Sequence, residues 1–457
     1  ESFDRQVFVS VITSQLSSLV NDMSGIVAIV GRPNVGKSTL FNRLIEERRA
    51  IVDDMSGVTR DRNYGQAEWT GHTFSVIDTG GYVPDSEDIF ETAIREQVHI
   101  AMEEADVLIF MVDVSTGVTP LDRDFANIVR RQPHKVLLAA NKVDASKHLE
   151  GIYEFYELGL GEVIPVSAMT GGGSGELLDA LVELLPAPEP ETEEDSVPKF
   201  AIVGRPNVGK SSFVNALIGK NLNIVTPIAG TTRDSVDTRF AAFGRDVVLI
   251  DTAGLRKRSK IDENIEFYST LRTVRAIEQC DVALLLIDAT QGLESQDMNI
   301  FSLMQKNRRG IVILVNKWDL VAKETNTAKE FEAQIKERIA PFVDVPIVFT
   351  STVTKQRLLK ALEVAQEVYE NMKRKITTSE LNDVMLTAIA KHHPPTFRGH
   401  IVRIKYVTQI PAKVPTILFF CNYPQGVKES YKRYLENKLR ARFDFTGVPL
   451  NLFFRKK

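Results

Sequence analysis

Cysteine is nearly absent from this chain of 457 residues, which contains only Cys280 and Cys421. Both lie beside or within apolar, strand-like runs, so the sequence supports neither a disulfide framework nor a cysteine metal site. Long apolar runs are missing too, and none approaches the roughly 20 residues that span a bilayer. These absences exclude disulfide-rich and membrane-spanning classes, and they favour a reducing, cytoplasmic setting.

Acidic residues are scarce in the last part of the chain. Residues 375–457 contain 15 Lys or Arg but 5 Asp or Glu, although the whole chain has a formal net charge of -4. A basic segment attracts phosphate backbones, so we expect residues 375–457 to bind nucleic acid. A solvated basic face without a ligand is the alternative, because charge alone gives no specificity.

Length and composition predict several domains. At about 150 residues per domain, the chain is long enough for three. Residues 1–22 lack the basic start and cleavage pattern of a signal peptide, and we treat them as an upstream segment of unknown role. Residues 186–198 are acidic and proline-rich, which predicts an interdomain linker.

A phosphate-binding signature occurs twice, as G-R-P-N-V-G-K-S at residues 31–38 and again at 204–211. Each copy follows an apolar run and opens into a helical pattern, which is the context that a P-loop requires. Glycines let backbone N–H groups close around phosphates, the lysine reaches the terminal phosphates, and the serine can ligate Mg²⁺. The predicted phosphate-binding residues are Gly31, Asn34, Gly36, Lys37, Ser38 and Thr39, and Gly204, Asn207, Gly209, Lys210, Ser211 and Ser212.

The repeat extends beyond these loops. Lys37 and Lys210 are 173 positions apart, as are Asp78 and Asp251. Apolar runs alternate with longer helical patterns in both copies, which predicts a mostly parallel sheet with helices on both faces. We therefore expect two copies of one α/β domain, at residues 23–185 and 199–374.

Two further motifs indicate the nucleotide. Each copy has a D-x-x-G sequence, ending at Gly81 and Gly254, whose aspartate can hold Mg²⁺ through water and whose glycine amide can meet the γ-phosphate. Each copy also has an N-K-x-D sequence, whose last carboxylate can accept both N–H donors of guanine, whereas adenine offers no such pair. We therefore predict GTP and GDP as ligands. The N-K-x-D residues are Asn141, Lys142 and Asp144, and Asn316, Lys317 and Asp319.

The last segment has a different pattern. Capping-box spacing at Thr377 and Glu380 begins an amphipathic helix, and the expected order is α-β-β-α-β in a small two-layer domain at residues 375–457. Its glycines do not form a G-x-x-G loop, so clamping of a single strand is not expected. We predict phosphate contact through basic residues on its second helix, with affinity falling roughly 10³-fold between 50 and 200 mM salt. These residues are Lys428, Lys432, Arg433, Lys438, Arg440 and Arg442.

Together with Thr59, Thr232 and the Ser167-Ala168 pair, these motifs resemble the five successive motifs of translation-factor-class GTPases. Their tandem repetition before a basic domain is similar to the bacterial Der/EngA GTPases, over nearly the whole chain. The resemblance implies two P-loop NTPase G domains in tandem, followed by a small α+β KH-like domain. It also implies a monomeric GTP hydrolase that assembles the large ribosomal subunit by binding its rRNA.

Two other functions stay open. An RNA-modification GTPase, of the type that acts on tRNA, shares the P-loop asparagine but should carry a catalytic cysteine or a modification domain, and neither is apparent. An RNA-binding protein with one structural nucleotide site is the other alternative. Substitution of Lys37 and of Lys210 distinguishes these cases.

The resemblance assigns further roles. It places Thr59 and Thr232 in switch I, where their hydroxyls complete a Mg²⁺ site with Ser38, Asp78, Ser211 and Asp251. Lys37, Thr59, Lys210 and Thr232 are the expected catalytic residues. Asn34 and Asn207 match the asparagine that helps to hold K⁺ in potassium-stimulated relatives, although asparagine in a tight turn also satisfies its own backbone.

Departures from the general motifs predict slow hydrolysis and different partners. Tyr82 and Leu255 stand where many GTPases have a water-orienting glutamine, so we expect unassisted turnover on the order of 10⁻³ s⁻¹ or less, with stimulation by potassium or a partner. The residues that follow are acidic in the first copy and basic in the second. The second copy also has Ser351-Thr352 in place of a Ser-Ala pair and lacks a nearby glycine, which places its base loop in doubt.

Overall fold

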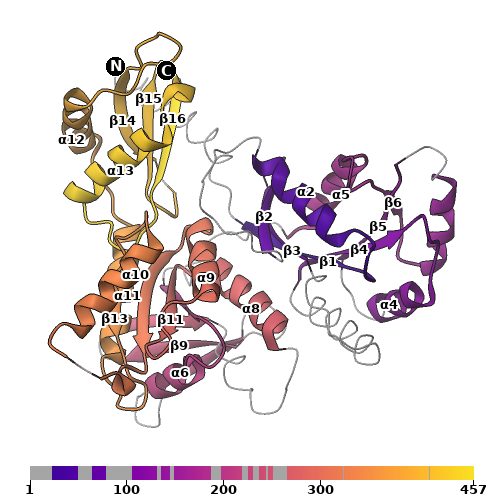
Figure 1. Ribbon diagram of the computed structural model, residues 1–457, viewed down its shortest axis with the longest axis horizontal. Helices are drawn as coiled ribbons and strands as arrows, with labels where there is room; N and C mark the ends of the chain where they lie inside the picture. The colour runs from indigo at the N-terminus through magenta and orange to yellow at the C-terminus, as the bar shows by residue number, and fades with distance from the viewer. Residues whose placement is uncertain are drawn as a thin grey trace. The chain divides into compact units, whose positions relative to one another are not determined.

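The computed structural model describes residues 23–49, 64–70, 72–78, 105–130, 135–144, 149–186, 197–218, 225–229, 236–242, 245–250, 265–322, 324–410 and 412–456. They divide into two compact units (Figure 1). One contains the first sheet, and the other contains the second and third sheets. Five predicted site residues lie outside the described ranges: Thr59, Gly81, Thr232, Asp251 and Gly254. So do residues 82–88 and 255–260, which carry the contrasting switch charges.

The first sheet has six strands in the order β2-β3-β1-β4-β5-β6. Its strands pair in parallel except for β2 with β3. The strands are β1 (Met23–Val30), β2 (Tyr64–Trp69), β3 (His72–Asp78), β4 (Val107–Asp113), β5 (Lys135–Asn141) and β6 (Val163–Pro165). The helices are α2 (Lys37–Arg49), α4 (Pro120–Arg130), η3 (Glu150–Leu158) and α5 (Ser174–Leu184). Every residue of β4 is buried, as expected for a central parallel strand.

The second sheet has seven strands in the order β13-β12-β11-β7-β10-β9-β8. The strands are β7 (Lys199–Val203), β8 (Val225–Ala229), β9 (Val236–Ala242), β10 (Arg245–Ile250), β11 (Val282–Asp288), β12 (Gly310–Asn316) and β13 (Ile347–Phe349). The helices are α6 (Lys210–Ile218), α8 (Ile265–Gln279), α9 (Ser295–Lys306), η5 (Trp318–Leu320), α10 (Thr327–Ile339) and α11 (Leu358–Met372). Both β11 and β12 are wholly buried. The predicted pair of α/β domains is therefore confirmed.

The third sheet forms a small domain in the predicted α-β-β-α-β order. Its elements are α12 (Thr378–Lys391), β14 (Ile404–Ile410), β15 (Thr416–Cys421), η6 (Pro424–Gly426), α13 (Glu429–Arg442) and β16 (Asn451–Lys456). Thr377 caps α12, since its hydroxyl accepts a hydrogen bond from the Glu380 N–H. Apolar residues of both helices pack with the sheet in one core that includes Leu381, Phe419 and Leu435. Within the described ranges, no helix is both long and apolar enough to cross a membrane.

Candidate nucleotide-binding sites

The two P-loops adopt the same strained backbone. In the first, Gly31 has φ 147° and Gly36 has φ 101°. A Cβ on Gly31 would lie 2.4 Å from the Met111 carbonyl oxygen, and one on Gly36 would lie 2.3 Å from Asn141 Nδ2. Because neither neighbour can yield, only glycine fits at these positions. The loop is thereby held against both β4 and the N-K-x-D motif.

The second loop repeats this geometry. Gly204 has φ 144° and Gly209 has φ 101°, and Cβ atoms there would lie 2.4 Å from the Leu286 carbonyl and from Asn316 Nδ2. Asn34 and Asn207 both have φ 63°, in the left-handed region that asparagine tolerates better than most residues. Each asparagine therefore has a backbone role in the turn, whether or not it also binds a cation.

Each P-loop lysine begins the following helix and turns back into its own loop. Lys37 Nζ donates to the carbonyl oxygens of Gly31 at 2.8 Å and Arg32 at 2.9 Å. Lys210 Nζ makes the corresponding bonds to Gly204 and Arg205, both at 2.6 Å. Burial lowers the pKa of Lys37 from 10.5 to about 8, and nearby Asp78 opposes this shift. The Lys37 amine, with its lowered pKa, therefore lies within the loop that is expected to bind the phosphates.

Two of the three predicted Mg²⁺ ligands of the first copy, Ser38 and Asp78, lie together. Ser38 Oγ donates to Asp78 Oδ2 at 2.5 Å, and Asp78 is 1% exposed at the end of β3. A hydroxyl and a carboxylate are hard oxygen ligands of the kind that Mg²⁺ prefers, so these residues fit that ion. When bound, Mg²⁺ would neutralise charge on the β- and γ-phosphates. In the second copy, Ser211 is described but its expected partner is not.

The N-K-x-D asparagines join separate loops. Asn141 Nδ2 donates to the Val35 carbonyl at 2.7 Å, and Asn141 Oδ1 accepts from the Ala168 N–H at 2.9 Å. Asn316 Nδ2 likewise donates to Val208 O at 2.9 Å, and its Oδ1 faces Thr350 Oγ1 at 3.4 Å. Each asparagine thus links its P-loop to its base loop.

The carboxylates predicted to read guanine differ in their surroundings. Asp144 Oδ1 accepts from Ser167 Oγ at 2.5 Å. Asp319 Oδ1 is buried and has no hydrogen-bond partner among the described residues. A buried carboxylate oxygen without a donor is costly, so ligand N–H groups would satisfy it. The arrangement at Asp319 therefore suits a base with adjacent donors.

The second base loop makes its turn without glycine. In the first copy, Gly171 and Gly173 have φ 91° and 73°. The corresponding Lys355 and Arg357 take φ 57° and 56°, and Ser351 exchanges two backbone hydrogen bonds with Gln356. Surrounding contacts thus maintain a left-handed backbone at residues that seldom adopt it. The second base loop therefore forms a turn like that of the first, although it has no glycine.

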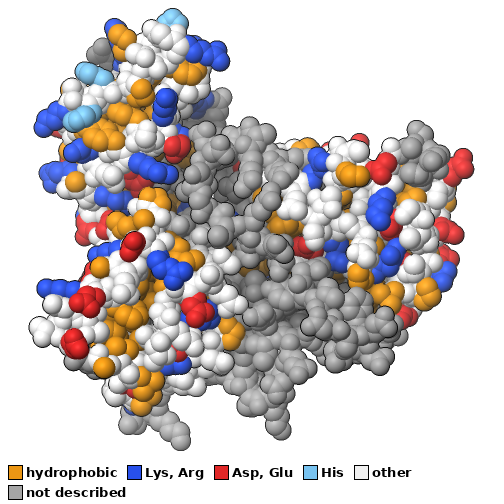
Figure 2. Space-filling view, viewed as in Figure 1, with side chains coloured by type: hydrophobic (Ala, Val, Ile, Leu, Met, Phe, Trp, Pro, Cys, Tyr) orange, Lys and Arg blue, Asp and Glu red, His pale blue; other side chains and the backbone are white. Residues whose placement is uncertain are grey.

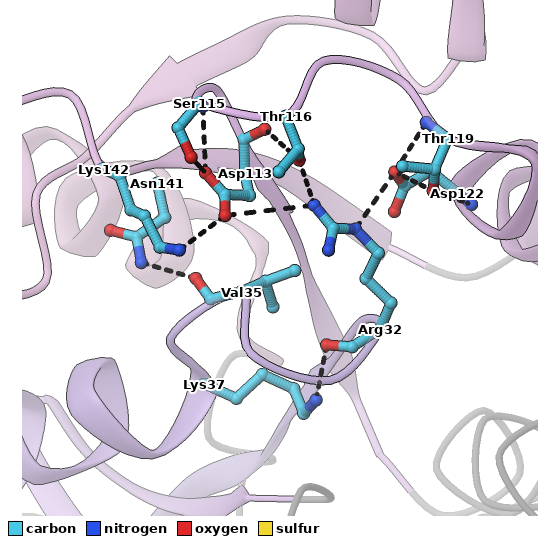
Figure 3. A network of polar contacts seen from close by, with 10 residues as sticks. All are labelled: Arg32, Val35, Lys37, Asp113, Ser115, Thr116, Thr119, Asp122, Asn141 and Lys142. Carbon is cyan, nitrogen blue, oxygen red and sulfur yellow. Dashed lines mark hydrogen bonds and ion pairs between the residues drawn. The ribbon is translucent and has the colours of Figure 1, made fainter. Parts of the chain in front are cut away.

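Sequence reasoning missed the aspartates that hold the N-K-x-D lysines. Lys142 Nζ donates to Asp113 Oδ2 at 2.6 Å (Figure 3). In the second copy, Lys317 Nζ donates to Asp288 Oδ2 at the same distance. Burial acts to raise the pKa of Asp113, but hydrogen bonds from Lys142 and Ser115 hold that pKa below its usual value. Asp288 has a lowered pKa with the corresponding causes. Both aspartates are therefore stable anions.

The P-loop arginines complete this network. Arg32 lies 3.5 Å from Asp122 and 3.9 Å from Asp113, as Figure 3 shows. Arg205 pairs with Asp297 at 2.9 Å and with Glu294 at 2.7 Å. The repeat carried a signal for these residues, since the arginines are 173 positions apart and the aspartate pairs 175 apart. The repeat spacing therefore relates the arginines and aspartates of the two copies, but it does not show which arginine pairs with which aspartate.

The basic residues predicted to contact RNA fall into two groups. Lys428, Arg433 and Lys438 are exposed. The others are ion-paired within the chain: Lys432 with Glu429, Arg440 with Glu436 and Asp344, and Arg442 with Glu380. Arg440 is 11% exposed and also donates to the carbonyls of Phe445 and Val448. The structure therefore removes Arg440 from the predicted contact set.

These features define a class. In each copy, a P-loop lies at a strand-to-helix junction and is joined by the N-K-x-D asparagine to the loop that begins with Ser167 or Ser351. This is the arrangement of a P-loop GTPase, and it occurs twice here. Residues 26–142 and 199–317 match the family described as 50S ribosome-binding GTPases. Residues 375–455 match the KH-domain-like C-terminal domain of EngA bacterial GTPases.

Comparison with curated relatives identifies the family within this class. The chain is 59% identical to the GTPase Der of Christiangramia forsetii and 57% identical to that of Flavobacterium psychrophilum, over 95% of this chain and 100% of each relative. The chain belongs to the GTPase Der family, and it binds and hydrolyses GTP. Among solved structures, Aquifex aeolicus Era bound to GDP·AlF₄⁻ is 29% identical, over 45% of this chain and 73% of that one, with a TM-score of 0.31. A likeness at that score supports no argument about function.

Proposed function

We propose that this GTPase is a timing factor for assembly of the large ribosomal subunit. In its GTP form it holds the subunit precursor through rRNA, and hydrolysis to GDP and phosphate ends that binding. The observation that carries the proposal is that one chain has two sets of guanine-nucleotide motifs followed by a basic C-terminal domain. The match to 50S ribosome-binding GTPases supports the same partner.

The proposed roles combine the geometry of the described residues with the motif pattern of the sequence. Lys37 and Lys210 contact phosphates, and Asp144 and Asp319 read guanine. Mg²⁺ would be held by Ser38, Asp78 and Thr59 in the first site and by Ser211, Asp251 and Thr232 in the second, where Thr59, Asp251 and Thr232 are assigned from the motifs alone. Domain limits at residues 23–185, 199–374 and 375–457, a monomeric state and a cytoplasmic setting belong to the same proposal.

Slow hydrolysis and potassium dependence are further parts of the proposal. No glutamine follows either D-x-x-G glycine, so a cation or a ribosomal partner must supply the missing stabilisation. Asn34 and Asn207 are the residues proposed to hold K⁺ beside the phosphates. Turnover at tens per second without potassium or particles would contradict this part.

Single-site variants test the function. Lys37→Ala and Lys210→Ala should each weaken GTP-dependent sedimentation with large-subunit particles and reduce GTP turnover, because each removes a phosphate contact. Lys329→Ala, on the exposed face of α10, is the matched control and should behave as the parent. If one lysine variant changes thermal stability but leaves turnover and sedimentation intact, that nucleotide site is structural. If the parent protein does not sediment with particles in any nucleotide state, the ribosomal role is wrong.

A further inference from the structure

A second basic surface lies on the C-terminal domain, apart from α13. Between Asp383 and Glu429 the chain has six Lys or Arg residues and no Asp or Glu. Three of them are exposed: Arg398 and Arg403 in the segment that leads into β14, and Lys405 at the start of that strand. None of the three has a carboxylate partner within the described ranges. Their charge is therefore available to an anionic ligand.

The surface is centred on a tight hairpin. Phe397 and His400 exchange backbone hydrogen bonds at 2.9 and 2.8 Å. The two residues between them, Arg398 and Gly399, have φ 48° and 80°, as in the two-residue turns that match strand twist. The turn presents Arg398 at its tip. Figure 2 shows Lys, Arg and His side chains around this domain, with comparatively few acidic ones.

The hairpin is fixed to the sheet. Asn422, which follows β15, accepts from the Arg403 N–H at 2.7 Å and donates to the Ile401 carbonyl at 2.9 Å. Behind the hairpin, a Cβ on Gly426 would lie 2.6 Å from Phe397 Cβ, so the two segments are in close contact. The surface is therefore preorganised, which lowers the entropic cost of binding.

Aromatic groups lie beside the cations. The His400 ring stacks on Tyr423, with centroids 5.3 Å apart and planes 18° from parallel. The His400 side chain is exposed to solvent, and neighbouring Ile401 is 58% exposed. An exposed ring backed by a second ring is a platform on which a nucleic-acid base can stack.

Local charge favours this surface over α13. Lys428, Arg433 and Lys438 are exposed on α13 or directly before it, but the other three basic residues predicted there are paired with carboxylates, so acidic side chains lie among the cations. The hairpin cations have no carboxylate partner within the described ranges. The domain also lacks the G-x-x-G loop with which other KH domains clamp a strand. An alternative binding element is thus required if the domain binds unpaired nucleotides.

We propose that the Arg398–Arg403 hairpin binds single-stranded RNA, with one base stacked on His400 and phosphates on Arg398, Arg403 and Lys405. This inference deepens the proposed ribosomal function, because it names the surface and the kind of RNA. It requires an unpaired or flipped-out nucleotide in the bound RNA. Duplex RNA offers the phosphates but not the exposed base face.

Fluorescence anisotropy with the full chain tests the proposal, using a labelled ten-nucleotide single-stranded RNA and a duplex of the same length. Arg398→Ala combined with Arg403→Ala should weaken binding of the single strand at least tenfold. It should also reduce the slope of log affinity against log salt by about 1.4, since about 0.7 is lost per phosphate contact. His400→Ala should weaken binding about tenfold at unchanged slope, and His400→Phe should restore it. Lys329→Ala, an exposed position on α10, is the control and should have little effect. Arg433→Ala combined with Lys438→Ala measures the contribution of α13 and should weaken binding less than the hairpin variants.

Several outcomes would overturn the inference. They are an equal or larger loss in the α13 variant, unchanged affinity in the hairpin variants, preference for the duplex, or equal hairpin-dependent binding to anionic lipid vesicles. Melting curves monitored by circular dichroism identify variants that fail to fold, and Lys405→Ala offers a second charge variant on a regular strand. Sedimentation with ribosomal particles separates the two proposals. If the hairpin variants still sediment with particles, the inference fails and the ribosomal function stands.

Discussion

Arg440 of α13 pairs with Asp344 of the second G domain, with Nη1 and Oδ2 3.1 Å apart. The same guanidinium lies 4.8 Å from the ring centroid of Phe342 and donates to the carbonyls of Phe445 and Val448. The Gly447 carbonyl accepts from the Ile311 N–H at 2.7 Å, at the start of β12. The C-terminal domain thus contacts the segments that lead into β12 and β13, whose far ends carry the base-reading loops.

Arg440→Ala should destabilise this unit strongly. The substitution removes a donor from two carboxylates, those of Asp344 and Glu436, and from two carbonyls. A hydrogen bond to a charged group contributes about 1.5–3 kcal/mol. Urea unfolding, monitored by tryptophan fluorescence, should show this loss, because Trp318 is buried in the second G domain. Arg433→Ala, an exposed position on the same helix, is the control. Equal stability of the two variants would show that the ion pair contributes little.

Base specificity should change one site at a time. In Asp144→Asn, the side chain presents an amide donor in place of one acceptor, which suits the 2-oxo group of xanthine better than the amino group of guanine. We expect at least a tenfold loss of GTP affinity in the first site and a gain of XTP binding. Asp319→Asn should do the same in the second site. Equilibrium titration of each variant with fluorescent GTP and XTP measures the switch, and unchanged GTP stoichiometry would refute these roles.

Asp113→Asn should weaken GTP binding in the first site without altering the choice of base. The variant keeps the shape of the side chain but loses the charge that holds the Lys142 ammonium at 2.6 Å. We expect roughly a tenfold loss of affinity, since a charge-assisted hydrogen bond is worth about 1.5–3 kcal/mol. Asp288→Asn should act in the same way on the second site. Glu176→Gln on the exposed face of α5 is the control, and parental affinity in Asp113→Asn would show that Lys142 needs no such partner.

The sequence predicted the parallel strands because a short, continuous apolar run such as that of β11 is typical of a strand buried on both faces of a sheet. It could not show that Asp113 holds Lys142, since that contact joins residues 29 positions apart that no local rule relates. Arg440 resembled its neighbours on α13 because a charge pattern does not reveal which face docks on another domain. The left-handed backbone at Lys355 and Arg357 could not be predicted for a similar reason, because tertiary contacts there override the usual preference for glycine.

Binding of nucleotide in the first site should weaken between pH 7.0 and 8.5. Because burial lowers the Lys37 pKa to about 8, the ammonium form falls from about nine tenths at pH 7.0 to about one quarter at pH 8.5. If phosphates bind the charged form, affinity falls about fourfold. The linked effect on folding has the opposite sense: the unfolded chain holds this proton more tightly, so the free energy of unfolding rises with pH between about 8 and 10.5.

Titrations with fluorescent GDP measure this pH dependence when made in an Asp319→Asn background, in which guanine binding at the second site is weakened at least tenfold. Lys37→Arg is the matched control, since a guanidinium stays charged throughout this range. Its affinity should be lower but nearly independent of pH. A fourfold decline shared by Lys37→Arg and the parent would assign the titration to another group, and the absence of any decline in the parent would show that Lys37 keeps an ordinary pKa.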